Sequence, residues 1–556
     1  MHLFRSSPVS SKPPAWFYAA TWARETSARL WMLLAGTFPL FLGGVTDSAR
    51  IWFAALASFS LLLWTGAQLI RFRAFSFRPA LGWLVAGVLL LGWTAALNPS
   101  FIFLGPNQGF LPLNHWSWLP SSVDAITSRT AMIRWTLMLG LLCMTADLCS
   151  NARRRFQMRI ALLSGGLILL LIALGQRLAE STSILGSGVG AEQPFFGTFI
   201  YPGSAGAYFN ALLPSYCLLL YDRRIQRWIG FVGVLLTGVA LFWNTSRISS
   251  VVGLLETLVL TAVLMRSREG TLEGVPSHQT TLVGARSERR TWAIGLLALA
   301  FLSLAVFQVH PLLEKWRMLP QQWTLSNPRV EAARVSLKIT RDAGFWGFGP
   351  GTFQSVFPQY TAGASKSIAG VWKHAHCDYL EFWIEWGCVG GLFWLCLLLG
   401  GVFEGFSLKL LPTMAPLSRS RSDFREKACG VAALCALGLH AIADFPLQNP
   451  SVLLVAFFWL GCAWSSHKSK IPQVQKAPKQ EIPPKAQITL SAAKESEKLP
   501  QRTQVPVVGG EHEITTLPEA PGCICNAAAS QACSKSNTAQ ITGLRVPSLR
   551  PVSRSV

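Results

Sequence analysis

The stretch Tyr379–Phe403 reads YLEFWIEWGCVGGLFWLCLLLGGVF, and its only charged residues are Glu381 and Glu385. A helix of this length crosses a hydrocarbon layer about 30 Å thick. Over the whole chain of 556 residues, 51% are hydrophobic and 14% are charged, whereas soluble proteins carry about 25% charged residues. This composition excludes a soluble globular enzyme. The length of the apolar runs, without alternation of apolar and polar residues, excludes an outer-membrane barrel.

Runs of this kind recur along the chain, and we predict about twelve transmembrane helices in an all-α polytopic membrane protein. The predicted spans are Leu30–Val45, Ile51–Ile70, Ala80–Leu97, Ala131–Cys149, Arg159–Gly175, Ala205–Tyr221, Trp228–Trp243, Ser249–Met265, Trp292–Val309, Tyr379–Phe403, Ala428–Ala443 and Ser451–Trp464. They divide the chain into an N-terminal segment (1–29), a transmembrane domain (30–465) and a tail (466–556). No apolar core with a cleavage site precedes the first span, so we expect that span to serve as the insertion signal.

The positions of Lys and Arg predict the orientation of the chain in the membrane. The segments after spans two, four, six, eight and ten carry 20 of them, counting Arg159 at the edge of span five. Those after spans one, three, five, seven and eleven carry 4. Because basic loops stay in the cytoplasm, both termini are expected there, and the long loop 310–378 is expected outside. The net charge of +22 is therefore explained by membrane topology, and no nucleic-acid partner is expected.

The tail has a different composition from the rest of the chain. From His467 to Pro506 it is rich in Lys, Pro, Gln and Glu and has almost no large apolar residues. Such a segment cannot bury enough apolar surface to offset the entropy lost on ordering. We predict a disordered, basic cytoplasmic tail. Its cysteines, Cys523, Cys525 and Cys533, match no standard zinc spacing and are expected to be unligated thiols.

Ionisable groups at membrane depth are costly, so each is a candidate functional residue. The densest group lies in KHAHCDYLEFWIEWG at 373–387 and comprises His374, His376, Asp378, Glu381 and Glu385. The three acids are spaced i, i+3 and i+7, so a helix places them on one face. We expect them to line the outer mouth of the tenth span and to face the bundle interior.

A second pair, His440 and Asp444, is spaced i, i+4 at the outer end of the eleventh span. Together the two groups indicate one outward-facing polar pocket. Two alternatives remain open from the sequence alone: polar caps that merely satisfy one another at a water interface, and a zinc site. The i, i+2 spacing of His374 and His376 and the lack of a further ligand pair argue against zinc, so no metal is expected.

Arginines on the predicted outer side are unusual, because the orientation rule keeps basic residues inside. Arg247 lies in a very short outer turn with the sequence NTSRISS at 244–250. In the long loop, SNPRVE at 326–331 predicts the start of a helix that includes Arg329 and Arg334. Guanidinium groups bind phosphate in bidentate fashion, so arginines beside a histidine indicate a diphosphate next to a general base. A snorkelling or helix-solvating role is the alternative for each arginine.

The predicted helix has Val330, Ala333 and Leu337 on one face and its basic residues on another. We expect it to end at Gly344. A glycine-rich turn follows at 347–353, and its amides are expected to approach an anion closely.

Four stretches of the chain resemble the O-antigen ligase and O-antigen polymerase superfamily of bacterial inner-membrane glycan transferases. GTFIYPGSAGA at 197–207 is similar to the family's Gly-Thr-Phe segment, and TSRI at 245–248 to its Ser-Arg turn. The stretch 327–351 is similar to its arginine and glycine loop, and 375–387 to its His-Asn-x-x-Leu…Glu-x-Gly signature. The chain has Cys377 where the family usually has Asn, and Tyr201 and Gly203 at positions where Asn is expected.

The resemblance implies transfer of a glycan from an undecaprenyl diphosphate carrier to an acceptor hydroxyl at the periplasmic side of the bacterial inner membrane. It implies that His376 accepts the proton of the acceptor hydroxyl and that Asp378 or Glu381 orients His376. Arg247 and Arg329, with Arg334, are expected to bind the diphosphate. His374, His440 and Asp444 are expected to support the pocket.

No cofactor is expected, because the donor is already activated. The acceptor is left open between lipid A core, a polysaccharide and a protein. The alternative function is a multi-span anion transporter, such as one for bicarbonate, since bundles with buried acids and arginines also move anions. The two halves of the chain show no internal repeat of the kind that many transporters have, which favours the transferase.

Overall fold

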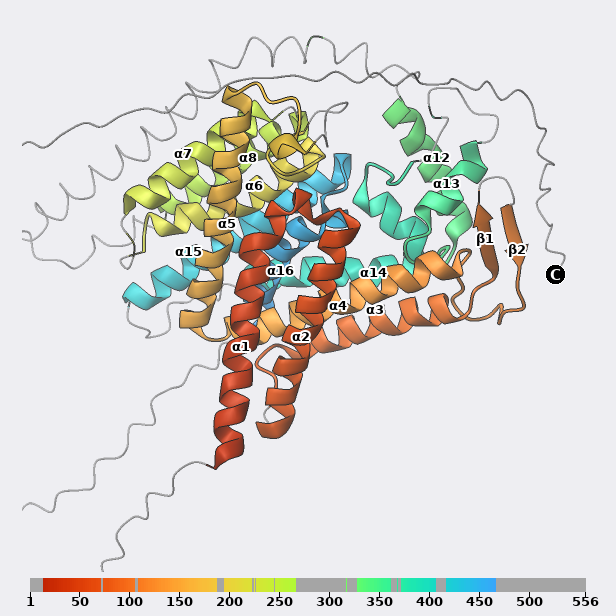
Figure 1. The fold of residues 1–556 in the computed structure, drawn as a ribbon, viewed down its shortest axis with the longest axis horizontal. Helices are drawn as coiled ribbons and strands as arrows, with labels where there is room; N and C mark the ends of the chain where they lie inside the picture. Colours follow the sequence, from red (N-terminus) through yellow and green to blue (C-terminus); the bar gives the residue numbers. More distant parts are fainter. Residues whose placement is uncertain are drawn as a thin grey trace, which may run out of the picture. The chain divides into compact units, whose positions relative to one another are not determined.

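The computed structural model describes residues 14–71, 74–105, 109–187, 195–222, 225, 227–244, 246–266, 317, 328–361, 368, 372–406 and 417–466. These residues belong to the first of two compact units, Met1–Val474. The helices of this part are α1 (Ala15–Thr37), α2 (Asp47–Arg71), α3 (Pro79–Leu97), α4 (Ala125–Cys149), α5 (Ala152–Leu178), α6 (Pro202–Leu219), α7 (Arg227–Trp243), α8 (Arg247–Arg266), α12 (Pro328–Ala343), α13 (Phe353–Thr361), α14 (Asp378–Phe406), α15 (Leu417–Ala443) and α16 (Pro450–Trp464) (Figure 1).

Eleven of the twelve predicted spans overlap helices, and the ninth, Trp292–Val309, lies outside the described residues. The first, Leu30–Val45, overlaps only the end of α1, which begins at Ala15, and its second half forms 3-10 turns. Seven helices in this part of the chain are long and apolar enough to cross a membrane, namely α2, α3, α4, α5, α8, α14 and α15. Helices α7 and α16 are apolar but shorter. The chain is therefore a helical, multi-pass membrane protein. The tail and its three cysteines lie outside the described residues.

Helices α6 and α16 form the centre of the bundle. Every residue of α6 is buried, as are nearly all residues of α16, as expected for helices that are apolar on all sides. The indole of Trp459 in α16 donates a hydrogen bond to the carbonyl of Ala211 in α6, at 2.9 Å. Helices α4 and α15 also pack against α16, so the charged residues at the ends of these helices have fixed positions.

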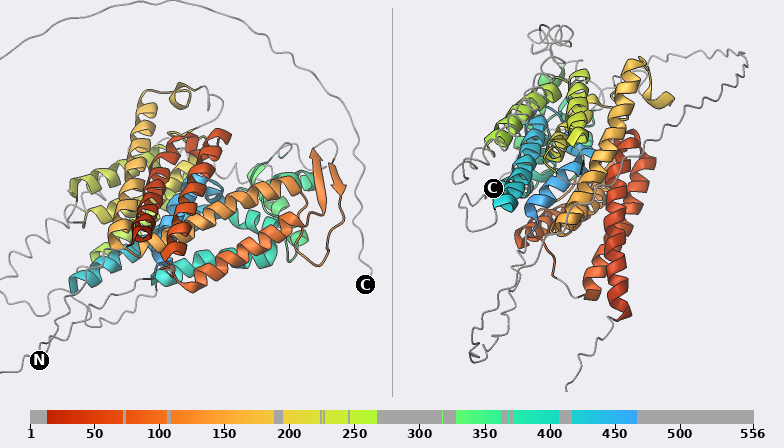
Figure 2. Two further views of the ribbon diagram at one scale, coloured as in Figure 1. Left: turned by 60° about the horizontal axis from the view of Figure 1, so that its bottom comes forward. Right: turned by 90° about the vertical axis from the view of Figure 1, so that its left-hand side faces the viewer.

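Helices α1 and α2 lie side by side, and α1 also packs against α5 (Figure 2). The crossing of α1 and α5 is very close, because a Cβ atom on Gly165 would lie 2.1 Å from the carbonyl oxygen of Gly36. Small residues permit such an approach between transmembrane helices.

A short antiparallel hairpin interrupts the all-α architecture between α3 and α4. It comprises β1 (Phe101–Gly105) and β2 (Gly109–Pro112), and it lies beside α12 and α13 (Figure 1). These strands were not predicted from the sequence. The remainder of this connection, residues 113–124, runs back to the start of α4.

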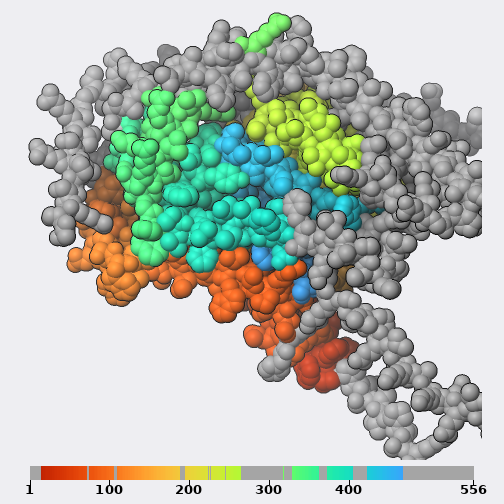
Figure 3. Space-filling model, turned by 180° about the vertical axis from the view of Figure 1, so that it is seen from behind, coloured from red at the N-terminus to blue at the C-terminus, as the bar shows by residue number. Residues whose placement is uncertain are grey.

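Helix α12 begins at Pro328 and ends before Gly344, which has a φ of +58°, as the sequence predicts. The face with Val330, Ala333 and Leu337 is not the buried one, however. The buried side chains are Ala332, Ser336, Ile339 and Ala343, which face a hydrophobic cluster with α13 and the start of α14, whereas Leu337 is exposed. Figure 3 shows the surfaces of α12 and α14 next to each other.

The glycine-rich turn after α12 packs against α14 through backbone contacts and hydrogen bonds. Gly347 and Gly387 both have positive φ, +76° and +64°, and a Cβ atom on Gly347 would lie 2.4 Å from the amide nitrogen of Gly387. The amide of Phe348 donates to the carbonyl of Ile384 at 2.9 Å. Only glycine allows both the conformation and the contact. The turn therefore attaches the end of α12 to the helix that carries the predicted acidic residues.

Candidate active site

His376 occupies a special backbone position just before α14. Its φ is +52°, a value that non-glycine residues rarely adopt. Three aromatic side chains surround its imidazole edge to face, Trp372 at 5.5 Å, Tyr201 at 6.2 Å and Phe445 at 4.9 Å between ring centroids. The side chain is still 23% exposed. Strained backbone at a partly open aromatic site is typical of functional residues.

The carboxylate nearest to His376 is that of Asp444, which follows α15. Its Oδ1 lies 3.9 Å from Nδ1 of His376, and its Oδ2 lies 3.7 Å from Nε2 of His440. Both distances exceed a hydrogen bond, and Nδ1 of His376 has no hydrogen-bond partner among the described residues. The structure thus brings together two histidines and one acid from segments that are 68 residues apart.

Asp444 is held in this position by the start of α6 and by its own backbone. A Cβ atom on Gly203 would lie 2.0 Å from Oδ2 of Asp444, so only glycine leaves room for the carboxylate. The amide of Phe445 donates to Oδ1 at 3.0 Å. Burial raises the pKa of the Asp444 carboxyl, but the neighbouring imidazoles of His376 and His440 lower it more, so its pKa lies well below its usual range. The group is therefore an anion beside His376.

Glu381 lies close to His374 and is not adjacent to His376. Its Oε1 contacts Nδ1 of His374 at 2.9 Å, and its Oε2 accepts a hydrogen bond from the Ala375 amide at 2.9 Å. The His374 ring also stacks on Phe445 at 4.5 Å. Glu381 therefore fixes the loop that leads into α14.

Asp378 also has a partner other than His376. It is fully buried, its Oδ2 accepts the amide of Leu447 at 2.8 Å, and its own amide faces the carbonyl of Asp444 at 3.2 Å. It joins the start of α14 to the turn η6 (Pro446–Gln448). Both oxygens of Glu381 and Oδ2 of Asp378 bind other groups, and Oδ1 of Asp378 has no hydrogen-bond partner among the described residues. The expectation that Asp378 or Glu381 orients His376 is therefore corrected, because the carboxylate that faces the imidazole is that of Asp444.

The third acid of α14, Glu385, accepts the amide of Phe353 at 3.3 Å. The expectation that the glycine-rich turn binds an external anion is therefore also corrected. The amides of Phe348 and Gly349 bind carbonyls of α14 at 2.9 Å. The anion that this turn approaches is the protein's own carboxylate.

Tyr201 and Arg329 form one edge of the candidate site. The ring of Tyr201 stacks on Phe445 at 4.9 Å, and a guanidinium nitrogen of Arg329 lies 3.5 Å from the Tyr201 hydroxyl. Burial, and then the negative charge of Asp444, raise the pKa of Tyr201 above its usual value. Arg329 is exposed in the first turn of α12, and its contact with Tyr201 places its guanidinium at the edge of the site.

The other two predicted arginines are placed differently. Arg247 is the half-buried first residue of α8. Its turn packs on the start of α6, where the Asn244 amide group donates to the Pro202 carbonyl at 2.7 Å. Arg334 is exposed on α12. Within the described part of the chain neither arginine forms an ion pair.

Two residues near the site were not identified from the sequence. Tyr201 could have been identified as a candidate site residue, because it occupies a position where the family has Asn. Arg134 was the clearer candidate, because it is a charged residue inside a predicted span. Its guanidinium lies over the ring of Trp135 at 5.2 Å and donates to the side chain of Gln448 at 3.3 Å, and it is electrostatically coupled to Glu385. It neutralises part of the acidic charge beneath the site.

The fold and the site define a multi-pass helical membrane protein with a histidine–carboxylate site at one end of its bundle. Residues 232–395 match the family described as O-antigen ligase. The matched segment begins within α7, includes Arg247, Arg329 and His376, and ends within α14. The match confirms the resemblance to the O-antigen ligase and polymerase superfamily, and with it a role in glycan transfer during surface polysaccharide synthesis. No curated protein matches the chain.

Proposed function

We infer that this protein transfers a glycan from an undecaprenyl diphosphate carrier to an acceptor hydroxyl at the periplasmic face of the bacterial inner membrane. The O-antigen ligase match supports the type of reaction. The observation that carries the mechanism is the placement of His376. Its partly exposed imidazole has Nδ1 directed at the Asp444 carboxylate 3.9 Å away and without a hydrogen bond to any described residue.

In the proposed reaction the Asp444 carboxylate accepts a hydrogen bond from Nδ1–H of His376, the proton stays on the imidazole, and this fixes the tautomer in which Nε2 is unprotonated. Nε2 then takes the proton of the acceptor hydroxyl as its oxygen attacks the anomeric carbon of the donor. A new glycosidic bond forms, and the bond between the anomeric carbon and the phosphate oxygen breaks. The bonding electrons leave with the diphosphate. Separations near 4 Å in the free enzyme commonly shorten when substrate is bound.

Arg329 is the best placed group to bind the diphosphate, because it is exposed and lies beside Tyr201 at the edge of the site. Arg247 is a second ligand in this proposal, since its turn packs against the start of α6. Guanidinium groups would stabilise the charge that develops on the leaving group. Arg334 is assigned a weaker role in attracting the donor, because its side chain is exposed on α12.

The proposed topology has twelve spans, both termini in the cytoplasm and residues 310–378 outside. The distribution of Lys and Arg supports it. This orientation places the end of the bundle that contains His376 in the periplasm, where a lipid-linked glycan and its acceptor meet. The region 30–465 is the proposed transferase domain, and 466–556 is the proposed cytoplasmic tail.

The test is the undecaprenyl diphosphate glycan pool in host membranes, measured by mass spectrometry for wild type and His376→Ala at matched protein level. His278→Ala, in a predicted cytoplasmic loop, is the matched control. We expect the loaded carrier to accumulate and a surface glycan to be lost in His376→Ala only, with a rate reduced about 10²- to 10⁴-fold. The missing glycan then identifies the acceptor.

If the pool and the surface are unchanged while His376→Ala remains inserted, the catalytic role of His376 is wrong. Anion uptake into proteoliposomes then tests the transporter alternative.

A further inference from the structure

Two tryptophans form an exposed platform in the connection between α3 and α4. The side chains of Trp116 and Trp118 are 66% and 72% exposed. Their rings are nearly parallel, with an interplanar angle of 16° and centroids 6.5 Å apart. Large exposed aromatic surfaces are costly in water, and when grouped they commonly mark a binding surface.

The platform is fixed by a clamp from the end of α3. Oδ1 of Asn98 accepts the amide of Trp116 at 3.0 Å, and its Nδ2 donates to the carbonyls of Trp116 and Pro120 at 3.0 and 3.1 Å. One side chain thus makes three hydrogen bonds to the backbone of the platform. A surface held in this way loses little conformational entropy on binding a ligand.

A hollow of about 460 Å³ lies beside the platform. Its lining residues are Thr94, Leu97, Asn98, Asn114, His115, Trp116 and Leu119. None of them carries a formal charge apart from a protonated histidine. Asn114 and His115 are exposed. Only Nδ1 of the imidazole is engaged with a described residue, the Leu113 carbonyl at 3.2 Å, so its Nε2 and the Asn114 amide are available to a ligand.

The platform connects directly to the layer that supports His376. The amide of Val123 donates to the carbonyl of Phe348 at 2.9 Å, and the hydroxyl of Ser355 donates to Asp124 at 2.8 Å. Val123 belongs to the same hydrophobic cluster as Trp372, whose ring contacts His376. In Figure 1 the hairpin that precedes the platform lies beside α12 and α13. The platform and the candidate active site therefore lie at the same end of the bundle.

We propose that the Trp116–Trp118 platform and its hollow bind the saccharide part of the substrate, which extends away from the reacting diphosphate. Sugar rings present flat C–H faces that pack on indoles, and their hydroxyl groups hydrogen bond to neutral amide and imidazole groups. The absence of Lys and Arg from the lining argues against a phosphate ligand. This inference rests on the proposed function, because it names the part of the glycan that the same site binds.

The experiment uses the full chain in lipid nanodiscs and saturation-transfer NMR. The probe is the glycan released by mild acid from the host's lipid-linked pool. We expect saturation of sugar C–H protons in wild type and an affinity reduced about tenfold in the Trp116→Ala/Trp118→Ala variant. Trp83→Ala, which removes a 78% exposed indole from α3, is the matched control and should bind as wild type does.

A second variant, Asn114→Ala/His115→Ala, removes the free polar groups without changing the platform clamp, and it should also weaken binding. Unchanged glycan binding in both double variants overturns the proposal and leaves the indoles as anchors in the lipid interface. Measuring both glycan binding and glycan transfer in His376→Ala separates the two inferences. That variant should bind glycan normally while transfer is lost, and continued transfer in it would refute the proposed function without touching the platform.

Discussion

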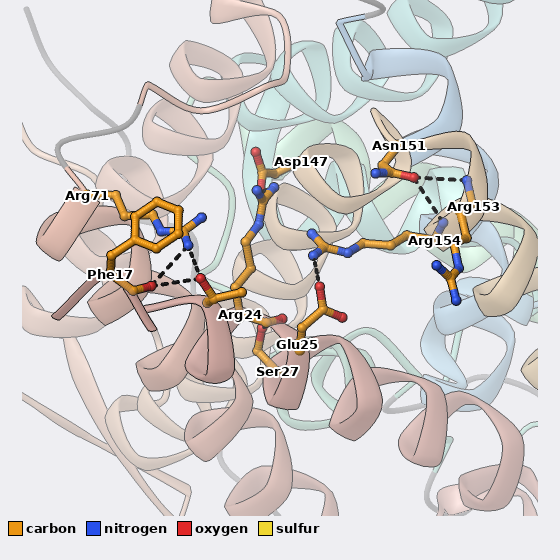
Figure 4. Close-up of polar contacts among 10 residues, drawn as sticks. Phe17, Arg24, Glu25, Ser27, Arg71, Asp147, Asn151, Arg153 and Arg154 are labelled. Atoms are coloured by element: carbon orange, nitrogen blue, oxygen red, sulfur yellow. Dashed lines mark hydrogen bonds and ion pairs between the residues drawn. The ribbon is translucent and has the colours of Figure 1, made fainter. Parts of the chain in front are cut away.

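Two clusters of charged residues, one around Asp147 at the C-terminal end of α4 and one around His376, differ in one respect. Asp147 is fully buried, and its Oδ2 contacts a guanidinium nitrogen of Arg24 at 2.6 Å. The same carboxylate accepts hydrogen bonds from Trp64, Gln68 and the amide of Ser76, at 3.1, 3.0 and 2.9 Å. Figure 4 shows Arg24 extended toward Asp147. Both carboxylate oxygens thus have partners.

Further ion pairs complete this end of the bundle. Arg154 pairs with Glu25 (Figure 4), and Glu426 pairs with both Arg155 and Arg159. In the second cluster His376 and His440 face Asp444 across distances too long for hydrogen bonds.

This difference predicts that one cluster stabilises the fold and that the other takes part in the reaction. A buried charge with all its partners stabilises the arrangement of helices, and removing one partner is strongly destabilising. A charge with unused hydrogen-bonding capacity at a partly open site is able to engage a substrate. The satisfied cluster around Asp147 should therefore respond to mutation in stability, and the unsatisfied cluster around His376 should respond in activity.

The largest expected effect is on stability at the Asp147 end. Asp147→Ala leaves Arg24 buried without its carboxylate partner, so we expect a loss of about 3–5 kcal/mol. Thermal unfolding of the purified chain in detergent measures it. Asp47→Ala is the control, because the Asp47–Arg50 pair spans 3.4 Å and the Asp47 side chain is 93% exposed. It should change stability by less than about 1 kcal/mol. Equal effects of the two variants would remove the contrast between the clusters.

A smaller effect, confined to activity, is expected at Asp444. Asp444→Asn keeps the size of the side chain but removes the charge beside His376, and we expect a rate about 10²-fold lower with unchanged thermal unfolding. Asp378→Asn is the comparison variant, because Asp378 accepts a backbone amide that an Asn oxygen also accepts. It should lose less activity than Asp444→Asn. The opposite order would restore Asp378 as the partner of His376.

The lowered pKa of Asp444 also predicts how the rates of wild type and Asp444→Asn depend on pH. Because the pKa of Asp444 lies well below its usual range, the charged carboxylate persists as pH falls and is lost only at more acidic values than an ordinary Asp near 3.9. The rate difference between wild type and Asp444→Asn should therefore still be present at pH 5. Convergence of the two rates at pH 5 would show that Asp444 is already protonated there.

The smallest of these effects is expected at Gly203. Its substitution by Ala puts a methyl group 2.0 Å from Asp444 Oδ2 and 2.5 Å from the Tyr201 ring, so both side chains must move. We expect a rate about tenfold lower, since displaced catalytic groups lose alignment. Gly66→Ala in α2 is the matched control, because a Cβ atom there meets nothing within 4 Å. A normal rate in Gly203→Ala would mean that the position of Asp444 does not limit the reaction.

The sequence by itself determined the helical membrane class, because apolar runs of this length have no other stable arrangement in a bilayer. It also determined the start and end of α12 through Pro328 and Gly344, since these residues act on the local backbone alone. The three acids of α14 share a buried face for the same local reason, their helical spacing. The O-antigen ligase resemblance was recognised from short motifs that keep their order along the chain.

Only the tertiary structure decided which acid faces His376. The pairing with Asp444 depends on how α15 meets the start of α6, and that contact requires Gly203 to lack a side chain. The attachment of Gly347 to Gly387 likewise joins two segments through backbone atoms, which leave no periodic pattern in the sequence. Local propensity acts within a few residues, whereas a site assembled from four distant segments is set by packing between helices.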